Sequence, residues 1–471
     1  MGEAAVAEMI ASDKRTVVVG LGLTGFSLAR YLTRLNEPFV VVDTRDEPPG
    51  LEDFKREFPE VPVYVGNKAA GVGSVLANAS QIMVSPGVSL DELGLSGERS
   101  SESNRNPEVI GDIEIFARVA LAPIIAITGS NGKSTVTTLV AEMAAAAEVK
   151  VAVGGNLGVP ALDLLSDDIE LYVLELSSFQ LETTYGLKAK VATVLNLSPD
   201  HMDRYADFPA YHRAKHRVFR GAEQVVINRD DALSEPLLPA TVQRWTFGLD
   251  KPDFGGFGLT YDPENQGSKG EGAWLVFETT ALMPVAELGI KGRHNVANAL
   301  AALALGHAVD LPMEAMLDVL RRFKGLPHRS QTVAEINGVV WIDDSKATNV
   351  GAAVAAIDSC ADDFSNLVLI AGGQSKGQDF APLATQLVGR VKHLILIGED
   401  AALIERAVSQ LDEELIPEVI RATTMAAAVQ TAQTLAASGD CVLLSPACAS
   451  FDMFSDYQAR GESFACAVRA L

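Results

Sequence analysis

The chain has 471 residues, a length that corresponds to about three domains at roughly 150 residues each. Hydrophobic residues make up 48% of the sequence and charged residues 21%, so several apolar cores can be filled and global disorder is excluded. The net charge of -23 argues against a general nucleic-acid or anionic-membrane surface, because phosphate groups are bound by clustered Lys and Arg.

Short β-branched runs alternate with helical patterns along the chain, which predicts an α/β fold with parallel sheets. In the first segment, strands are expected at 16–19 and 38–43 and a helix at 26–35. Residues 20–25 have the sequence Gly-Leu-Gly-Leu-Thr-Gly, which matches the dinucleotide fingerprint, and Asp43 follows at the spacing of a ribose contact. This loop alone is compatible with a nicotinamide dehydrogenase or with a purely structural turn. The polar stretch at 91–107 predicts an exposed loop before a domain boundary near Gly111.

The second segment is expected to open with a strand at 124–128, a Gly-rich turn and a helix at 135–147. The turn, Thr-Gly-Ser-Asn-Gly-Lys-Ser-Thr at 128–135, lies where backbone N–H groups and a helix N-terminus hold polyphosphate, so ATP is the predicted ligand. Ile127 stands where the strict phosphate-loop motif has glycine. Lys133 is expected on the β- and γ-phosphates and Ser134 on Mg²⁺. Two such loops in one chain favour two different nucleotides over a dehydrogenase.

Residues 250–272 are polar and Gly-rich and predict a meandering insertion, followed by an Ala-rich helix at 295–305 and a turn at 325–327. Strands are then expected at 339–342, 367–370, 394–397 and 442–444, which predicts a further α/β domain. The predicted domains are therefore 1–111, 112–325 and 326–471.

The four cysteines, Cys360, Cys441, Cys448 and Cys466, have no paired Cys-x-x-Cys spacing and are interpreted as reduced core thiols. No apolar run approaches the roughly 20 residues that a membrane span needs. The first ten residues lack the features of a secretory signal, so we expect a cytoplasmic protein without membrane insertion.

Four strings resemble the Mur ligases, and among them the branch that adds D-glutamate: Gly-Gly-Asn-Leu-Gly at 154–158, Leu-Glu-Leu-Ser-Ser-Phe-Gln at 174–180, Asn-Leu-Ser-Pro-Asp-His-Met-Asp at 196–203 and Asp-Asp-Ser-Lys-Ala-Thr-Asn at 343–349. The resemblance extends from Thr16 to the C-terminus. It implies an ATP-dependent amide ligase that joins D-glutamate to UDP-N-acetylmuramoyl-L-alanine through an acyl phosphate. It also implies a Rossmann-like UDP-binding N-terminal domain, a central P-loop ATPase-type domain, a Rossmann-like C-terminal domain, domain closure, and a monomer.

The resemblance assigns binding residues in each domain. Those implied for the UDP-substrate are Gly22, Leu23, Thr24, Gly25, Asp43, Thr44, Arg45, Ser85, Pro86, Gly87 and Asn156. Those implied for ATP are Gly129, Ser130, Asn131, Gly132, Lys133, Ser134, Thr135, Asn295, Asn298, Arg329 and Asp344. Those implied for D-glutamate are Thr348, Lys376, Ser450 and Tyr457. Two departures from the family pattern are Gln374, where an acidic residue is common, and Tyr457 in place of Phe.

The resemblance also implies two Mg²⁺ ions, held by Ser134, Glu175, His201 and a carbamylated Lys215, and catalytic roles for Lys133, His201, Lys215 and Lys346. A carbamate would supply the anionic oxygens that Mg²⁺ prefers and that an ammonium lacks. A buried strand carboxylate such as Glu175 must be paired or bind a cation, so the alternative for it is a plain salt bridge. Without the resemblance, His201 would be interpreted as an ordinary surface or packed residue and Lys215 as a solvated lysine. Asp43 would be a capping or surface residue, and Asn156, Asn295 and Asn298 helix-surface groups.

Four other functions remain open at this point, one of them a nicotinamide dehydrogenase on the glycine loop at 20–25 alone. A sibling Mur ligase or a folylpolyglutamate synthase would share the central phosphate loop, although the N-terminal glycine loop disfavours the folate enzyme. A catalytically inactive nucleotide-binding module would share both loops. The sequence does not single out a base for the amine of D-glutamate.

Overall fold

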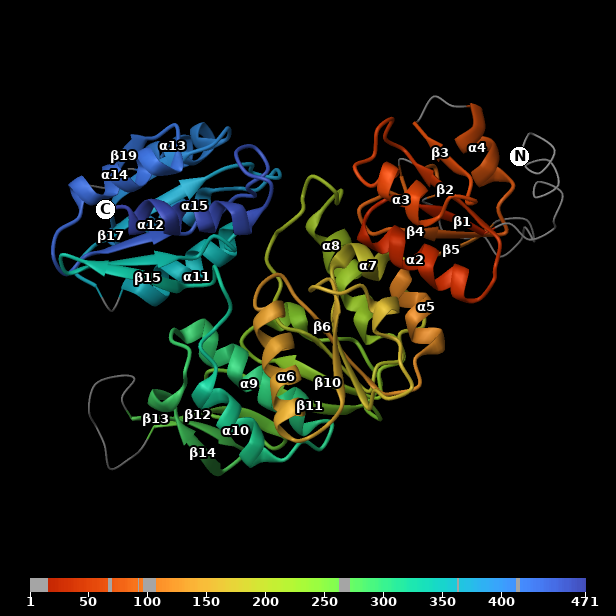
Figure 1. Cartoon of the computed structure of the whole chain (residues 1–471). Coiled ribbons are helices and arrows are strands. Elements are labelled where there is room, and N and C mark those ends of the chain that lie inside the picture. The colour runs from red at the N-terminus through yellow and green to blue at the C-terminus, as the bar shows by residue number, and fades with distance from the viewer. Residues whose placement is uncertain are drawn as a thin grey trace.

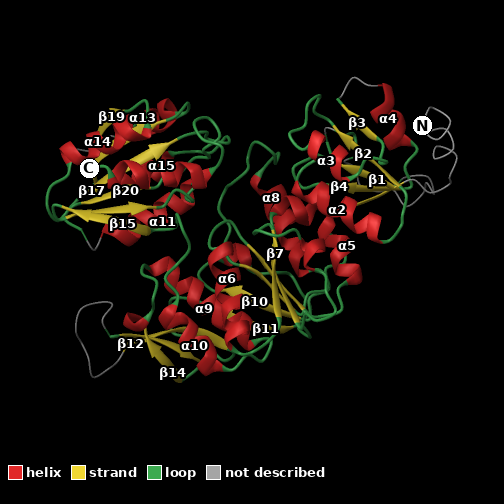
Figure 2. Cartoon of the chain, in the orientation of Figure 1, coloured by secondary structure: helices red, strands yellow, loops and turns green. Residues whose placement is uncertain are grey.

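The fold of the chain is described from a computed structural model, which covers residues 16–66, 70–91, 93–95, 107–261, 272–361, 364–411 and 416–471. These residues form three α/β units in chain order, and the first and third units lie on opposite sides of the second (Figure 1). Each sheet is flanked by helices (Figure 2), so the predicted three-domain α/β class is confirmed. The structure does not describe the first ten residues, where no secretory signal is expected. Most of the predicted loop at 91–107 also lies outside the described residues.

The first unit has a parallel sheet with the strand order β3-β2-β1-β4-β5. Its strands are β1 (Thr16–Val19), β2 (Phe39–Asp43), β3 (Val63–Val65), β4 (Gln81–Val84) and β5 (Glu108–Ile110). Its helices are α2 (Leu23–Arg34), α3 (Leu51–Glu57) and α4 (Ala70–Ala77). Helix α2 begins three residues before the predicted start, because the glycine loop continues directly into it from Gly22 without a side-chain cap.

The second unit has a sheet with the order β14-β13-β12-β11-β10-β9-β6-β8-β7, and β6 lies between β8 and β9. Its strands are β6 (Ile124–Thr128), β7 (Val151–Gly155), β8 (Leu171–Glu175), β9 (Val191–Val194), β10 (Gln224–Asn228), β11 (Gln243–Phe247), β12 (Gly256–Tyr261), β13 (Ala273–Phe277) and β14 (Thr280–Pro284). Its helices are α5 (Asp112–Val119), α6 (Lys133–Ala146), α7 (Ser178–Glu182), α8 (Phe208–His216), α9 (Arg293–His307) and α10 (Met313–Arg322). The short 3₁₀ turns are η1 (Ala161–Leu164), η2 (Arg217–Phe219), η3 (Ala232–Ser234) and η4 (Val285–Glu287).

Within the predicted meandering insertion at 250–272 the structure describes residues 250–261 and 272, and it places the regular strand β12 at Gly256–Tyr261. Strand β12 runs parallel to β11, and β13 and β14 then continue the sheet as an antiparallel meander. Phe257 of β12 and Leu275 of β13 are buried in the core of the second unit. Residues 262–271 lie outside the described residues.

The third unit has the strand order β15-β16-β20-β17-β18-β19, parallel except for the edge strand β15. Its strands are β15 (Gln331–Ile336), β16 (Val339–Asp343), β17 (Leu367–Gly372), β18 (Val391–Ile397), β19 (Glu418–Arg421) and β20 (Cys441–Leu444). Its helices are α11 (Val350–Ala361), α12 (Ala381–Leu387), α13 (Ala401–Ser409), α14 (Met425–Leu435) and α15 (Tyr457–Arg469). Because β16, β20 and β17 are parallel neighbours, the loops at 344–349, 445–450 and 373–378 gather at one edge of the sheet.

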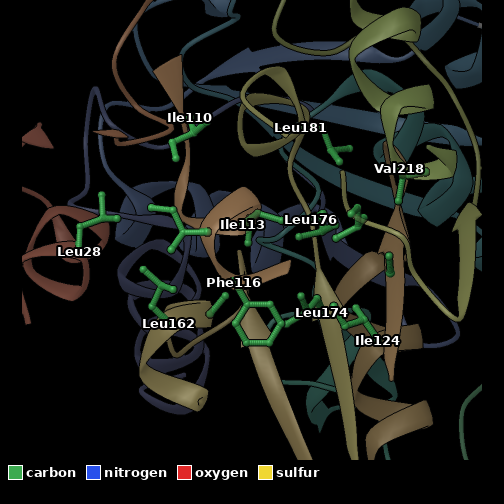
Figure 3. Close-up of a cluster of buried hydrophobic side chains, with 14 of the residues drawn as sticks. Leu28, Ile110, Ile113, Phe116, Ile124, Leu162, Leu174, Leu176, Leu181 and Val218 are labelled. Carbon is green, nitrogen blue, oxygen red and sulfur yellow. The ribbon is translucent and has the colours of Figure 1, made fainter. Parts of the chain in front are cut away.

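The apolar cores join the first two units and leave the third separate. One continuous cluster contains Leu28 and Ile110 of the first unit together with Phe116, Leu162 and Leu174 of the second (Figure 3). The clusters on the two faces of the third sheet contain residues of the third unit alone. The first two units are therefore packed as one body through buried apolar surface.

All four cysteines are free thiols, but only part of the core prediction holds. Cys360, Cys441 and Cys448 are buried, whereas Cys466 is exposed on α15, so the core interpretation of Cys466 is wrong. Among the described residues, no helix is long and apolar enough to cross a bilayer.

Candidate active site

The glycine loop between β6 and α6 has the geometry that a phosphate site requires. Gly132, the residue before α6, has φ +83°, and a Cβ there would lie 2.4 Å from Asn298 Oδ1. Side chains from the next loop brace it, since Asn131 N donates to Asn196 Oδ1 at 2.8 Å. Only glycine satisfies both the left-handed backbone and the close approach of α9. The missing glycine at Ile127 does not alter this loop, because Ile127 is a buried residue of β6.

Lys133, in the first turn of α6, folds back over the loop. Its Nζ donates to the carbonyl oxygens of Gly129 and Ser130 at 2.8 and 2.9 Å. Burial lowers the pKa of Lys133, and this effect outweighs the opposite one of Glu175 and Asp200. The ammonium group is thus held where a polyphosphate bound by the loop would lie.

Glu175 ends β8 directly beside β6 and is 3% exposed. Its Oε1 accepts a hydrogen bond from Asn156 Nδ2 at 2.6 Å, whereas its Oε2 has no hydrogen-bond partner among the described residues. Burial alone would raise the pKa of Glu175, but Lys133, Ser134 and Asn156 lower it below its usual value. Glu175 forms no salt bridge within the described part of the chain, so the salt-bridge alternative is not what the structure places there.

An ionised, buried carboxylate with an open oxygen next to a serine hydroxyl fits a hard cation such as Mg²⁺. Among the described residues, no group of three or more His, Cys, Asp or Glu side chains is arranged to hold a metal. Phosphate oxygens and Ser134 would therefore have to complete the coordination begun by Glu175.

Lys215 lies on α8 and is 2% exposed. Its Nζ donates to Gly129 O at 2.8 Å and lies 4.9 Å from the centre of the Tyr211 ring. Burial, followed by the charge of Lys133, lowers the pKa of Lys215 well below its usual value. The alternative of a solvated lysine is therefore wrong, and the neutral amine that burial favours is the form that reacts with CO₂ to give a carbamate.

His201 follows β9 in a left-handed backbone conformation, with φ +57°. Its ring lies 4.8 Å from that of Phe179, and burial lowers its pKa from 6.5 to about 4. His201 is thus neutral near pH 7, as a metal-binding imidazole must be. The structure does not bring His201 into direct contact with Lys215 or Glu175.

The third unit reaches the phosphate loop at several points. Arg329 Nη2 donates to Ser134 Oγ at 2.8 Å. Lys376 Nζ forms an ion pair with Asp200 Oδ1 at 2.6 Å. Asn349, which is 3% exposed, donates to Asn131 Oδ1 at 3.1 Å and to Asp200 Oδ2 at 3.3 Å.

Asp200 and Asn349 lie within the strings that carry the family resemblance, but the sequence analysis did not select them. In the sequence, only their position within these strings pointed to a function. Nothing in the sequence indicates that they pair across the two units.

A cavity of about 320 Å³ lies between the second and third units, beside the phosphate loop. The residues around it come from the phosphate loop, α6, α9, the ends of β10 and β11, and the segments before β15 and after β16, and they include Asn131, Thr135, Asn228, Phe247, His294, Asn295, Asn298, Arg329, Asp344 and Lys346. Its volume and mostly apolar wall suit a purine ring. The structure thus brings Asn295 and Asn298 of α9 to the nucleotide loop, and it adds Asn228, Phe247 and His294, which the sequence did not single out.

Asn156 lies in the loop after β7, so the interpretation of a helix-surface group is wrong for it.

Two charged groups of the third unit have altered pKa values at this boundary. Burial raises the pKa of Asp344 from 3.8 to about 7, although the carboxylate accepts hydrogen bonds from Ser330 N and Ser445 Oγ. Burial, followed by the charge of Arg329, lowers the pKa of Lys346 to about 8. Lys346 Nζ lies 3.8 Å from the centre of the Tyr457 ring, which brings these two predicted residues together.

In the remaining amino-acid site, Ser450 is buried and Thr348 is half-buried, both on loops at the same sheet edge. Thr348 N donates to Lys346 O at 2.8 Å, which fixes the two side chains on one turn. The structure therefore gathers these predicted D-glutamate residues at one edge of the third sheet.

The glycine loop of the first unit is closed by Asp43, which is 2% exposed. Asp43 Oδ2 accepts from Leu21 N at 2.8 Å, and Arg45 pairs with the same oxygen at 2.7 Å. Burial would raise the pKa of Asp43, but these partners lower it. A Cβ on Gly25 would lie 1.9 Å from Gly20 O, so the third glycine allows α2 to pack closely on the strand. The surface alternative for Asp43 is therefore wrong, because its side chain is buried against the glycine loop.

Other residues predicted for the UDP-substrate surround the same loop. Ser85 Oγ donates to Gly20 O at 3.4 Å, which places the loop at 85–87 next to the glycine turn. Leu23 is 78% exposed, so the first turn of α2 presents an apolar side chain at the mouth of this loop.

The fold and this geometry define a modular α/β enzyme with a nucleotide site between two units. Family models match along the chain: a Mur ligase MurD-like N-terminal domain at 14–104, a Mur ligase middle domain at 127–306 and a Mur ligase glutamate ligase domain at 328–448. The chain belongs to the Mur ligase family.

Relatives within the family are similar over nearly the full length. The chain is 55% identical over 464 residues to UDP-N-acetylmuramoylalanine–D-glutamate ligase of Pseudomonas syringae pv. tomato, covering 98% of this chain and 99% of that protein. It is 50% identical over 463 residues to the ligase of the same name from Marinobacter nauticus, covering 98% and 100%. The structure of UDP-N-acetylmuramate-alanine ligase from Thermotoga maritima has the same fold, with a TM-score of 0.59, 16% identity and coverage of 97% and 99%.

Proposed function

We propose that the chain joins D-glutamate to UDP-N-acetylmuramoyl-L-alanine, with cleavage of ATP to ADP and phosphate, in peptidoglycan precursor synthesis. Relatives that share about half of its residues over their whole length bear the name of this ligase. The observation that carries the proposal is the contact of Arg329 with Ser134, because it joins the third unit to the phosphate loop of the second. A reaction between groups held on two units needs such a boundary.

The proposed division of labour follows the predicted domains 1–111, 112–325 and 326–471. The first would bind the UDP moiety at Gly22 to Gly25, the second ATP at the phosphate loop, and the third D-glutamate through Thr348, Lys376, Ser450 and Tyr457. Asn156, hydrogen-bonded to Glu175, would lie near the substrate carboxylate. We propose a monomer in the cytoplasm.

The reaction has two steps. A carboxylate is a poor electrophile, so a carboxylate oxygen of the UDP-substrate first attacks the γ-phosphorus of ATP and ADP leaves. The amine of D-glutamate, having lost a proton, then attacks the carbonyl carbon of the acyl phosphate, and inorganic phosphate leaves as the amide forms. The first step brings anions together, and Lys133 and Arg329 would offset their repulsion by position and charge.

The chain offers two groups of residues for Mg²⁺. Ser134 and Glu175 would hold one ion, and His201 with carbamylated Lys215 would hold a second. Once bound, the ions supply charge neutralisation across the phosphate oxygens. The open Oε2 of Glu175 and the neutral state of His201 support these assignments.

The test is phosphate release from ATP with UDP-N-acetylmuramoyl-L-alanine, Mg²⁺ and single amino acids. We expect turnover with D-glutamate, and none with L-glutamate, D-aspartate, D-alanine or diaminopimelate. Mass spectrometry should show the product heavier by one glutamyl residue. Turnover with a different amino acid and none with D-glutamate would assign the chain to another branch of the family.

A further inference from the structure

Arg460, in the first turns of α15, is buried without a carboxylate partner. It is 1% exposed, and no salt bridge connects it to any carboxylate of the described chain. The carboxylates of Asp343, Asp344 and Asp452 lie near it without bonding to it, and a buried guanidinium is costly unless its N–H donors are satisfied. Burial also lowers the pKa of Arg460 from 12.5 to about 10, which leaves it charged near pH 7. We therefore expect a structural role for the buried, charged side chain of Arg460.

The donors of Arg460 are used on two loops. Its Nε donates to Ser345 Oγ at 3.0 Å and its Nη2 to Ser345 O at 2.8 Å. Its Nη1 donates to Cys448 O at 3.0 Å and to Ala449 O at 3.2 Å. The guanidinium of Arg460 has five N–H donors and makes these four hydrogen bonds, so the planar fork of arginine fits both loops at once.

Two of the three residues that Arg460 contacts are next to a residue proposed for the reacting end or for D-glutamate. Ser345 precedes Lys346, and Ala449 precedes Ser450. The C=O of Ala449 points to the guanidinium, so in the trans peptide the N–H of Ser450 points away from it. Arg460 thereby sets which face of this loop presents its amide hydrogen.

Two further contacts extend this framework. Ala449 and Gln374 exchange backbone hydrogen bonds at 2.9 and 3.0 Å, which ties the loop of Lys376 to the one that Arg460 holds. Ser345 Oγ donates to Tyr457 O at 2.8 Å, which ties in the first residue of α15.

The neighbouring Gly461 allows α15 to approach this closely. A Cβ at this position would lie 2.2 Å from His328 Nδ1 and 2.8 Å from Asp343 Oδ2. His328 and Asp343 are themselves joined at 2.7 Å, and His328 precedes Arg329. The start of α15 therefore packs against the segment that reaches the phosphate loop as well as against the loops of the amino-acid site.

We propose that Arg460 is a positioning residue for the second substrate: it aligns the loops of Lys346, Ser450 and, through Gln374, Lys376, so that together they receive the carboxylates of D-glutamate. This inference rests on the proposed function. It assigns Arg460 no contact with substrate, and it predicts that the residue acts on amide formation and not on acyl phosphate formation.

The two half-reactions separate this role from a general effect on folding. Acyl phosphate formation is measured without D-glutamate, by trapping with hydroxylamine as a hydroxamate from UDP-N-acetylmuramoyl-L-alanine, ATP and Mg²⁺. Amide formation is measured at varied D-glutamate. For Arg460→Lys, which keeps the charge but not the fork, we expect a KM for D-glutamate raised by about tenfold or more, because several charge-assisted bonds are lost. Its hydroxamate rate and its KM for ATP should stay within twofold of wild type.

Two variants make the test decisive. Arg421→Lys alters an exposed arginine of β19 that pairs with Glu405 in the same unit, and it should leave both half-reactions unchanged. Ser345→Ala removes the acceptor of Arg460 Nε and the donor to Tyr457 O, and it should raise the KM for D-glutamate about threefold or more. Ser345→Ala decides the matter alone if Arg460→Lys does not fold.

A KM for D-glutamate within twofold of wild type in the folded variants overturns the inference. An equal loss of both half-reactions also overturns it, because it would indicate a general structural role. A wild-type protein that gives no hydroxamate refutes the proposed function instead, whatever Arg460 does.

Discussion

The ion pair between Asp200 and Lys376 makes the boundary of the second and third units open to a quantitative test. The two side chains are 9% and 12% exposed and their charged atoms lie 2.6 Å apart. Burial would raise the pKa of Asp200, but Lys376, His201 and Lys133 bring it down from 3.8 to about 2. At about 1.4 kcal/mol per pKa unit, this shift corresponds to roughly 2 to 3 kcal/mol in favour of the ionised form.

Asp200→Asn removes the charge and keeps the shape, so it should lower the stability of the contact between the units by at most about 2 kcal/mol, or roughly thirtyfold in the ratio of docked to undocked protein, because only the part of the shift due to Lys376 belongs to this contact. The pH dependence has a defined sign. The pKa of Asp200 is depressed in the folded protein, so its contribution is complete above 3.8 and is lost as the pH falls through about 2. The loss in Asp200→Asn should therefore be fully expressed at pH 7.

The assay is the distance between fluorescent labels on the second and third units in ligand-free protein, with Cys466 replaced because its exposed thiol would react. Small-angle scattering should show a larger radius of gyration for Asp200→Asn. The matched control is Asp318→Asn, which breaks an exposed pair with Arg321 inside the second unit and should change neither signal. Identical distance distributions for wild type and Asp200→Asn would refute the reasoning.

The remaining predictions concern the phosphate loop and its neighbours. Lys133→Ala should lower hydroxamate formation by about 10²- to 10³-fold, measured at saturating ATP, and an unchanged rate would remove this residue from phosphoryl transfer. Exhaustive removal of CO₂ should abolish turnover until bicarbonate is restored, with a labelled carbamate carbon visible by NMR in wild type and absent in Lys215→Arg; indifference to CO₂ would exclude the carbamate. Because the pKa of His201 falls to about 4, the unfolded chain binds a proton between pH 6.5 and 4 that the folded chain does not, so the free energy of unfolding should drop as the pH falls through this range. His201→Asn should flatten this slope in chemical denaturation, and an unchanged slope would argue against a depressed pKa.

The strands were the most predictable part of the fold. Strands β1 and β6 lie at the residues expected from their apolar β-branched runs, because a strand buried on both faces must be apolar throughout. The helices that follow the two glycine loops were placed two or three residues too late. Both begin after a glycine that has no side-chain cap, so the sequence lacks the usual Ser, Thr or Asp signal for a helix start.

The site was predictable only as far as local motifs reach. The loop at 128–135 indicates phosphate binding because residues that are adjacent in the sequence form this site. The pairing of Asp200 with Lys376 joins positions that are 176 residues apart, and no periodicity or spacing in the sequence indicates this pairing. The burial of Lys215 was hidden in the same way, because α8 has an ordinary basic sequence and only the packed fold shows that its Nζ points to Gly129 O.

The different ways in which the three units are joined have a mechanical consequence. The chain passes from the second to the third unit near Gly325, whose φ is +88°, between the core residue Phe323 and the third-unit residue His328. Beyond this crossing the third unit meets the second through polar contacts, such as Arg329 with Ser134 and Lys376 with Asp200, and not through a shared apolar core. A rotation about the crossing therefore breaks hydrogen bonds and an ion pair, whereas a rotation of the first unit against the second would expose buried apolar surface to water.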